Sequence, residues 1–140
     1  MAWTLQPIII EQSHNYLRWR LHCISDGNAL TATDIFSESY TPRDLKSRLQ
    51  GHTYMRMDYV PDGTLTPTDE ITITLSNTVG TTMWSGDTTA AATAETFDLS
   101  TDIAMYPTFY AKMFIAFDDP GAAGEVFDLY FECWKESGNA

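Results

Sequence analysis

The sequence has few cysteines and few basic residues, and each shortage excludes a class of protein. Its 140 residues include 2 Cys, and 8 Lys and Arg stand against 19 Asp and Glu, which gives a formal net charge of −11. A surface this acidic repels phosphate backbones, so nucleic acid is not expected as a partner. The longest aliphatic run near the N-terminus, Ile8 to Ile10, is too short for a signal peptide or a membrane span. We therefore expect no secretion signal and no membrane partner.

The two cysteines, Cys23 and Cys133, lie far apart and have neither Cys-x-x-Cys nor Cys/His spacing. Both occupy apolar-phase positions of expected strands, where a free thiol behaves as a small hydrophobic side chain. We expect both to be free and buried. A disulfide between these two strands, or between subunits, is the alternative.

Spaced motifs for catalysis, cofactors and metals are also missing. The histidines His14, His22 and His52 have no His-x-His or His-Glu-x-x-His spacing, so no zinc site is expected. There is no Gly-x-Ser-x-Gly, no Gly-x-Gly-x-x-Gly and no Gly-Lys-Ser/Thr element. We therefore assign no catalytic residue, no cofactor and no metal, and we expect a protein that is not an enzyme.

The densest carboxylate set surrounds the last expected turn and comprises Asp118, Asp119, Glu125 and Asp128. Such oxygens could hold calcium, but the set lacks the spacing of an EF-hand loop. An acid/base pair would need burial that the sequence does not predict here. A solvated turn is the preferred interpretation.

The composition is that of a folded protein, with 44% apolar and 13% aromatic residues. A chain of this length buries a sizeable core without a disulfide or a metal. We expect a single domain over residues 1–135 and a flexible tail over residues 136–140.

Alternation of apolar and polar residues predicts most of the strands. It is clearest where Leu17, Trp19, Leu21 and Cys23 alternate with charged residues. Pro7 suggests an edge position for the first strand, because proline donates no ladder hydrogen bond. The expected strands are Leu5–Ile10, Tyr16–Ile24, Ala29–Phe36, Tyr54–Val60, Ile71–Leu75, Phe109–Phe117 and Val126–Trp134. Asp26-Gly27-Asn28 is expected to join the second and third of these as a hairpin.

Two segments have a different character. Thr41-Pro42-Arg43-Asp44 is typical of a helix start, and Gly51 would end a helix of about two turns, although a bent strand is the alternative. Asp87 to Phe97, with Ala90 to Ala92 inside it, is expected to be a loop with at most one helical turn.

Short strands separated by turns predict an all-β fold, an antiparallel β-sandwich of jelly-roll-like type with about seven or eight strands and one short helix. A β-barrel is the alternative. One core is expected to contain Leu17, Trp19, Leu21, Ile71, Ile73, Leu75, Met113, Ile115, Leu129 and Phe131.

Two segments resemble a family of small tailed-phage virion structural proteins. They are Gly63-Thr64-Leu65-Thr66-Pro67-Thr68-Asp69-Glu70-Ile71-Thr72-Ile73-Thr74-Leu75 and Gly124-Glu125-Val126-Phe127-Asp128-Leu129-Tyr130-Phe131. The similarity covers about residues 49–134, but Asn77-Thr78-Val79-Gly80 is shorter than the family's acidic glycine run. These motifs describe a fold, so no catalytic or binding residue carries over.

The resemblance implies a component of a bacteriophage virion, made in the host cytoplasm. We expect a capsid decoration or cement protein that binds the particle as a homo-oligomer, with the major capsid protein as partner. A neck, collar or tail accessory protein that binds neck or tail proteins is the second possibility. From a different class, a glycan-binding β-sandwich module would use Trp84.

Two sequence features bear on contacts with other chains. Aromatic residues near expected turns and termini suggest an interface formed by Trp3, Tyr40, Trp84, Tyr106 and Phe109, because exposed rings often mark contact surfaces. Alternatively, these rings are buried under the loops at the ends of the sandwich. Six of the 8 basic residues fall within the first 56 positions, namely Arg18, Arg20, Arg43, Lys46, Arg48 and Arg56. Such asymmetry fits stacking against a neighbouring subunit, and it also arises by chance.

Overall fold

The computed structural model describes residues 2–13, 16–35, 54–76, 82–88, 93–98, 113–118 and 121–134, and strands account for most of them. The strands are β1 (Thr4–Gln12), β2 (Tyr16–Asp26), β3 (Leu30–Asp34), β4 (Tyr54–Pro61), β5 (Thr72–Ser76), β6 (Thr82–Asp87), β7 (Glu95–Asp98), β8 (Phe114–Phe117) and β9 (Ala123–Trp134). No helix in these ranges has the length and apolar character needed to span a bilayer.

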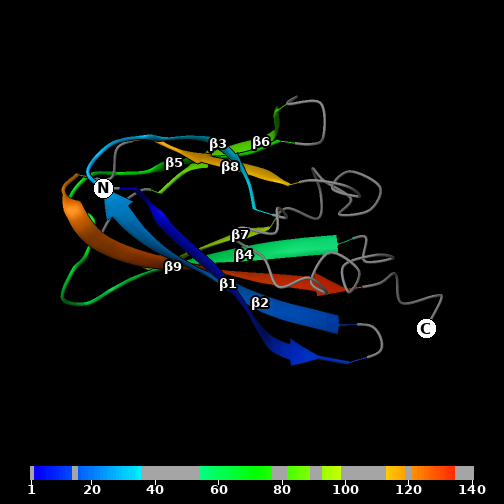
Figure 1. Ribbon diagram of the computed structural model, residues 1–140. Helices are drawn as coiled ribbons and strands as arrows, with labels where there is room; N and C mark the ends of the chain where they lie inside the picture. The colour runs from blue at the N-terminus through cyan, green and yellow to red at the C-terminus, as the bar shows by residue number, and fades with distance from the viewer. Residues whose placement is uncertain are drawn as a thin grey trace.

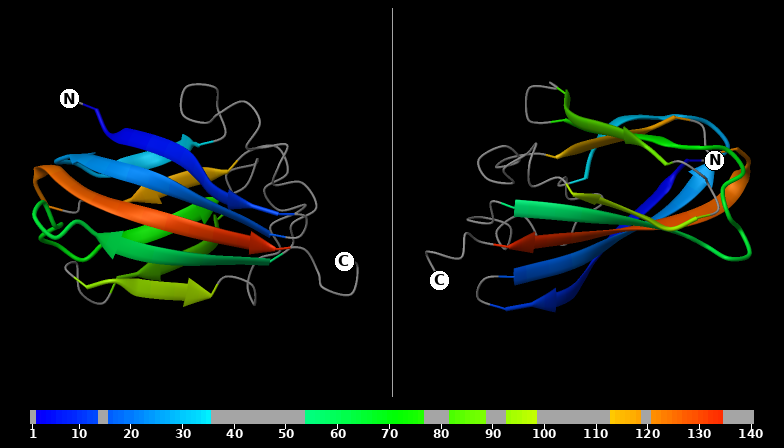
Figure 2. Two further views of the ribbon diagram at one scale, coloured as in Figure 1. Left: turned by 90° about the horizontal axis from the view of Figure 1, so that it is seen from below. Right: turned by 180° about the vertical axis from the view of Figure 1, so that it is seen from behind.

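The strands form two antiparallel sheets that lie face to face (Figure 1). Sheet A has the order β1-β2-β9-β4-β7, and sheet B has the order β3-β8-β5-β6. The two sheets do not close into a barrel, as the view from behind shows (Figure 2, right). The predicted β-sandwich is therefore confirmed, and the barrel alternative is wrong.

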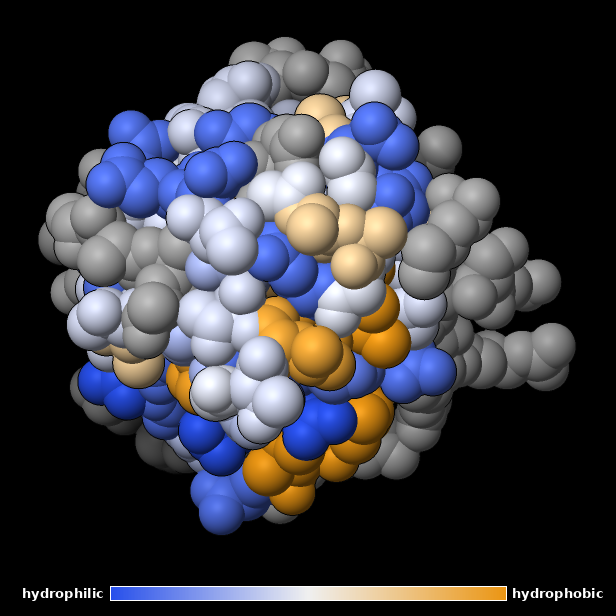
Figure 3. All heavy atoms as spheres, turned by 90° about the vertical axis from the view of Figure 1, so that its left-hand side faces the viewer, coloured by the Kyte–Doolittle hydropathy of each residue, from blue (hydrophilic) through white to orange (hydrophobic). Residues whose placement is uncertain are grey.

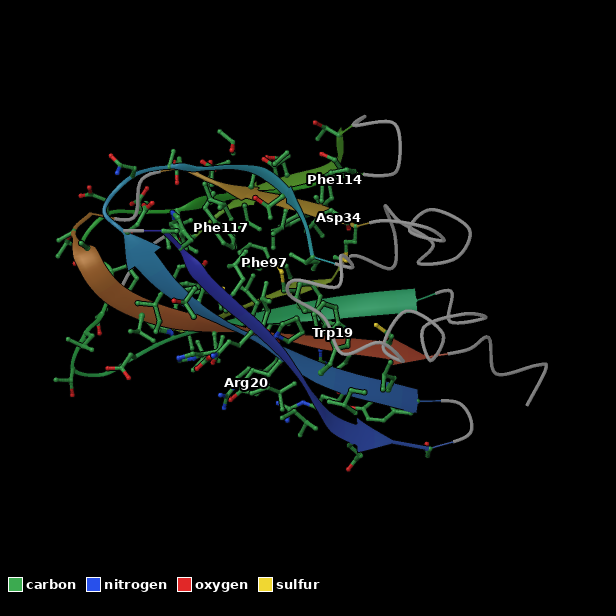
Figure 4. The ribbon with its side chains drawn as sticks, viewed as in Figure 1. Trp19, Arg20, Asp34, Phe97, Phe114 and Phe117 are labelled. Carbon is green, nitrogen blue, oxygen red and sulfur yellow. The ribbon has the colours of Figure 1, made fainter. Side chains whose placement is uncertain are left out.

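The core fills the space between the sheets, because one side of nearly every strand is apolar. Burial alternates residue by residue along the whole of β2. Trp19 points toward sheet B, whereas its neighbour Arg20 points away from it (Figure 4). The Trp19 ring stacks on Phe131 of β9 with ring centroids 4.3 Å apart. All of the predicted core residues are fully buried, which confirms the strand phases.

The edge position predicted for the first strand is also confirmed. β1 pairs only with β2 among the described strands and is the outermost strand of sheet A. Pro7 is opposite Leu21, and the register shifts between Ile9 and Glu11. A proline and a bulge are both typical of edge strands.

Two local predictions are wrong. The segment after Gly27 does not return beside β2, because β3 pairs with β8 in sheet B. Gly27 does adopt a left-handed backbone with φ +89°, but turn residues of this kind are equally suited to a chain that crosses to the other sheet.

The prediction of a loop over Asp87–Phe97 is wrong at the end of this segment, since β7 is a strand that pairs with β4. Phe97 packs against the core, and this tertiary contact outweighs weak local preferences.

Some predictions lie outside the described residues. They are the short helix beginning at Thr41, residues 109–112 of the strand expected over Phe109–Phe117, and the tail over residues 136–140. The described part of that strand is β8, and Met113 beside it is buried.

Residues 63–75 and 124–131 meet at one end of sheet A. The Val126 N–H donates to the Leu65 carbonyl at 2.7 Å, and the Asp62 N–H donates to the Val126 carbonyl at 3.0 Å. An Asp62 carboxylate oxygen accepts the N–H groups of Thr64 and Leu65 at 2.7 and 2.8 Å. These backbone hydrogen bonds, first that from Leu65, lower the pKa of Asp62. The loop before β5 is therefore fixed to the start of β9.

Both cysteines are free and buried, as predicted, and the disulfide alternative is wrong within this chain. Burial raises the pKa of the Cys133 thiol to about 12, although the adjacent Trp19 indole N–H acts in the opposite direction. Burial likewise raises the pKa of Cys23 well above its usual value. Neither thiol is a reactive group in the folded protein.

Candidate binding surface

The side of sheet A that faces away from sheet B carries most of the large polar side chains described. We call this side the outer face of sheet A; Figure 2, left, looks onto it. Strand alternation dictates its composition, because each polar residue is next to a core residue in sequence. Its residues include Ile8, Ile10 and Glu11 on β1, Tyr16, Arg18, Arg20 and His22 on β2, Asp128, Tyr130 and Glu132 on β9, and Arg56, Asp58 and Val60 on β4.

One group on this face is built around Glu132. Its carboxylate accepts the hydroxyl of Tyr16 at 2.5 Å and the guanidinium of Arg56. The pKa of Glu132 is lowered, because these hydrogen bonds outweigh the opposing effect of burial. Burial and the hydrogen bond to Glu132 raise the pKa of Tyr16 to about 12. Because β2 and β4 flank β9, this group connects three adjacent strands.

A second group is built around Asp128, which faces His22 directly across the β2/β9 ladder. The His22 Nδ1 lies 2.7 Å from an Asp128 carboxylate oxygen, and the Arg20 Nε lies 3.5 Å from the same oxygen. The Arg20 contact is an ion pair rather than a well-formed hydrogen bond. Between the two groups, the Arg18 guanidinium lies over the Tyr130 ring at 4.5 Å from its centroid. This is cation–π geometry.

An apolar margin borders these charged groups on β1. Ile8 is 40% exposed and Ile10 is 44% exposed, which is high for aliphatic side chains of this size. Leu65 is 51% exposed on the loop that adjoins β9. Hydrophobic side chains gather between hydrophilic ones on the side of the molecule that lies at the left in Figure 1 (Figure 3).

The opposite side of the molecule, the outer face of sheet B, differs in chemistry. Its described contacts join small polar side chains: the Thr72 hydroxyl donates to the Asp87 carboxylate at 2.6 Å, and the hydroxyls of Thr74 and Ser85 lie 3.2 Å apart. Phe114 and Ala116 of β8 lie on the same side. Known protein interfaces are enriched in Tyr and Arg and depleted in Ser. The outer face of sheet A therefore has the composition of a contact surface, and the described part of sheet B does not.

The aromatic interface predicted from the sequence is not assembled by the described residues. Trp3 is buried at 9% exposure and packs on Phe117 with ring centroids 5.2 Å apart. Its indole N–H donates to the Asn28 carbonyl at 3.0 Å. Trp3 is therefore a core residue, and the expectation of an exposed ring there is wrong.

The other predicted aromatics have two outcomes. Trp84 on β6 is half-buried, and its ring meets Phe97 of β7 edge-on at 5.3 Å, between the two sheets. Tyr40, Tyr106 and Phe109 lie outside the described residues.

The carboxylate set of the last turn is dispersed. An Asp118 oxygen accepts the Thr72 N–H at 2.7 Å, whereas an oxygen of the buried Glu125 accepts the Ala122 N–H at 2.8 Å. Asp128 belongs to the outer face of sheet A, and Asp119 lies outside the described residues. Across the ranges that the structure describes, no group of three or more His, Cys, Asp or Glu side chains could hold a metal ion.

Sequence reasoning missed most of the contacts on the outer face of sheet A. The alternation along β2 placed Arg18, Arg20 and His22 on one side, but it gave no information about the strand beside them. Only the β2/β9 register shows that Arg18 is opposite Glu132 and His22 is opposite Asp128. One feature of the sequence could have predicted the exposed isoleucines. Ile8 to Ile10 form an uninterrupted apolar run on a strand expected at a sheet edge, so the run cannot lie wholly on the buried face.

No family model matches the chain, and no curated protein matches it. Among solved structures, the chain is similar to the cupin domain of Cnp3 from Schizosaccharomyces pombe, with a TM-score of 0.38 and 6% sequence identity. That match covers 99% of this chain and 69% of the other. A likeness at this level says nothing about function.

Proposed function

We propose that this chain is a structural subunit of a tailed-phage virion, a capsid decoration or cement protein that binds the particle through the outer face of sheet A. The virion assignment rests on the resemblance of residues 63–75 and 124–131 to phage structural proteins. A neck, collar or tail accessory role would use the same face on a different partner.

The contrast between the two outer faces carries the proposal. Sheet A presents arginines, tyrosines and exposed isoleucines, whereas the described part of sheet B presents mainly Thr and Ser hydroxyls, with Asp87 and one aromatic ring, Phe114. A protein that binds through one flat face needs large side chains there, because anchors such as Tyr and Arg contribute most of the binding free energy.

Charge supports the same face. Arg18, Arg20 and Arg56 stand against Glu11, Asp58, Asp128 and Glu132 on the described part of the outer face of sheet A, so this face is close to neutral on a chain of net charge −11. The excess negative charge must then lie elsewhere on the molecule. A nearly neutral face can approach an acidic particle surface without the repulsion that the rest of the protein would meet.

The test is the composition of purified virions, measured by mass spectrometry together with density for this chain. We expect the wild-type chain on the particle, the Arg18→Glu variant largely lost from it, and the Thr74→Glu control retained. Arg18→Glu removes the contact with Tyr130 and reverses the charge at position 18 on the outer face of sheet A, whereas Thr74 lies on sheet B. Absence of the wild-type chain from mature particles would exclude a virion role. Equal loss of both variants would exclude sheet A as the binding face.

The glycan-binding alternative gains no support from the site. A sugar stacks on an open aromatic face, but the Trp84 ring is half-buried against Phe97. A glycan array on the purified protein would test this alternative directly.

A further inference from the structure

We infer that β1 is a self-association edge: β1 of one copy pairs antiparallel with β1 of a second copy and joins two A sheets into one continuous sheet. This inference specifies the oligomer in the proposed function. It is tested on the isolated protein, without particles, so failure of one proposal does not imply failure of the other.

The described strands leave two edges in each sheet, namely β1 and β7 in sheet A and β3 and β6 in sheet B. β1 is the longest of these edge strands, with 9 residues against 4, 5 and 6 for β7, β3 and β6. It has no charged residue from Thr4 to Ile10. Each described edge strand contains a carboxylate, but the uncharged run is longest on β1: Glu11 lies near its end, whereas the shorter strands contain Asp34 on β3, Asp87 on β6 and Glu95 on β7.

This difference selects a second copy as the occupant. Edge strands present free backbone donors and acceptors, and proteins protect such edges with charge, proline or a bulge. β1 has a proline and a bulge but no charged residue before Glu11. A chain with net charge −11 repels its own copy over most of its surface. The uncharged part of β1 is the described edge where two copies can approach without placing carboxylates opposite carboxylates. Glu11, at the end of this part, is already opposite Arg18 of its own sheet.

The exposed isoleucines fit an antiparallel pair. A two-fold axis beside Ile9 brings Ile8 of each copy close to Ile10 of the other, on the outer face of both sheets. Ile10 lies in the register shift between Ile9 and Glu11, so the two side chains are neighbours across the axis rather than a regular ladder pair. In this arrangement the β-branched side chains would cover one another. Their exposures of 40% and 44% in the single chain are the apolar surface that this contact removes from water.

The same features limit the assembly to two copies. Pairing β1 with itself is isologous, so a two-fold axis closes the assembly. The joined sheet then ends in two β7 edges of 4 residues each, where the negative charge of Glu95 would oppose further pairing. Pro7 and the register shift after Ile9 keep the paired region short.

The first experiment measures the mass of the purified chain by sedimentation equilibrium at physiological salt. We expect wild type to be a dimer and the Ile8→Lys/Ile10→Lys double variant to be a monomer, because ammonium groups would then face each other across the axis. Val60→Lys is the matched control: Val60 is 37% exposed on β4, an interior strand of sheet A, and its variant should remain a dimer. Thermal unfolding checks that all three proteins are folded.

The second experiment uses cysteine cross-linking, which the buried native thiols should not disturb. Under mild oxidation, Ile8→Cys/Ile10→Cys should form disulfide-linked dimers and Val60→Cys should not, since side chains that are neighbours across the axis have the spacing that disulfides require. A wild-type monomer at the highest soluble concentration would overturn the proposal. The proposal would also be overturned if the wild type formed open-ended aggregates, or if Val60→Lys dissociated the dimer as fully as Ile8→Lys/Ile10→Lys does. Association with a different protein but not with a second copy would overturn it as well.

Discussion

Leu129→Ala is the sharpest test of the sandwich, because Leu129 lies on the central strand of sheet A. The side chain is fully buried, with Leu21 of β2 on one side and Tyr59 of β4 on the other. The substitution removes three carbon atoms, worth about 2.4 kcal/mol at about 0.8 kcal/mol each. The cavity left in a core held by two flanking strands brings the total loss to about 3 to 4 kcal/mol.

The assay is urea unfolding followed by tryptophan fluorescence, since Trp19 is buried in the same core. At a typical slope for a small domain, the midpoint should fall by about 1 to 3 M. Val60→Ala is the control: Val60 is one residue along β4 from the partner of Leu129, but it is 37% exposed on the outer face. We expect it to cost about 0.5 kcal/mol or less. Equal losses for the two variants, or a loss below about 1 kcal/mol for Leu129→Ala, would refute the assignment of faces.

Three further predictions follow from single sites. The pKa of Glu132 is lowered in the folded state, so the carboxylate stabilises the fold above its ordinary pKa of 4.5, and this stabilisation is lost as the pH falls through the folded pKa. Glu132→Gln should therefore lower the free energy of unfolding at neutral pH and make that free energy fall less steeply with acid. Urea midpoints that are the same for wild type and variant from neutral to acidic pH would contradict this prediction. Gly121→Ala should lower the free energy of unfolding by more than about 1 kcal/mol, because φ at Gly121 is +131° and an added Cβ would collide with Thr68 and Glu125. Gly63→Ala is the control: a Cβ at Gly63 would meet open space, so the variant should be nearly neutral in the same unfolding assay. A thiol-reactive dye should label neither cysteine in the native protein and both after denaturation; rapid native labelling would contradict their burial.

The sequence by itself determined which side of most strands is buried. Successive side chains of an extended chain point to opposite faces, so apolar residues at alternate positions all lie on one face of the strand. That face must then be the buried one. Leu17, Trp19 and Leu21 were assigned to the core for this reason, and all are fully buried. Pro7 likewise placed the first strand at an edge, because a missing N–H excludes a central position.

Only the tertiary structure decided which strands are neighbours. The turn at Gly27 permits either a hairpin or a crossing to the other sheet, and the packing of β3 against β8 selected the crossing. β7 has little strand preference of its own and forms because β4 supplies its hydrogen bonds. The sequence predicted an exposed ring at Trp3, because it lies near the N-terminus. In the fold, Phe117 and Phe127, which are distant in sequence, pack against this ring.

The candidate surface has the same mixed origin. Alternation along β2 and β9 placed the polar residues on one face, but the ladder register decided that Glu132 meets Tyr16 and Arg56. Register depends on contacts between strands far apart in the chain, and a one-residue slip would change every pair. The sequence therefore specifies what each face is made of, and the fold specifies which of those groups act together.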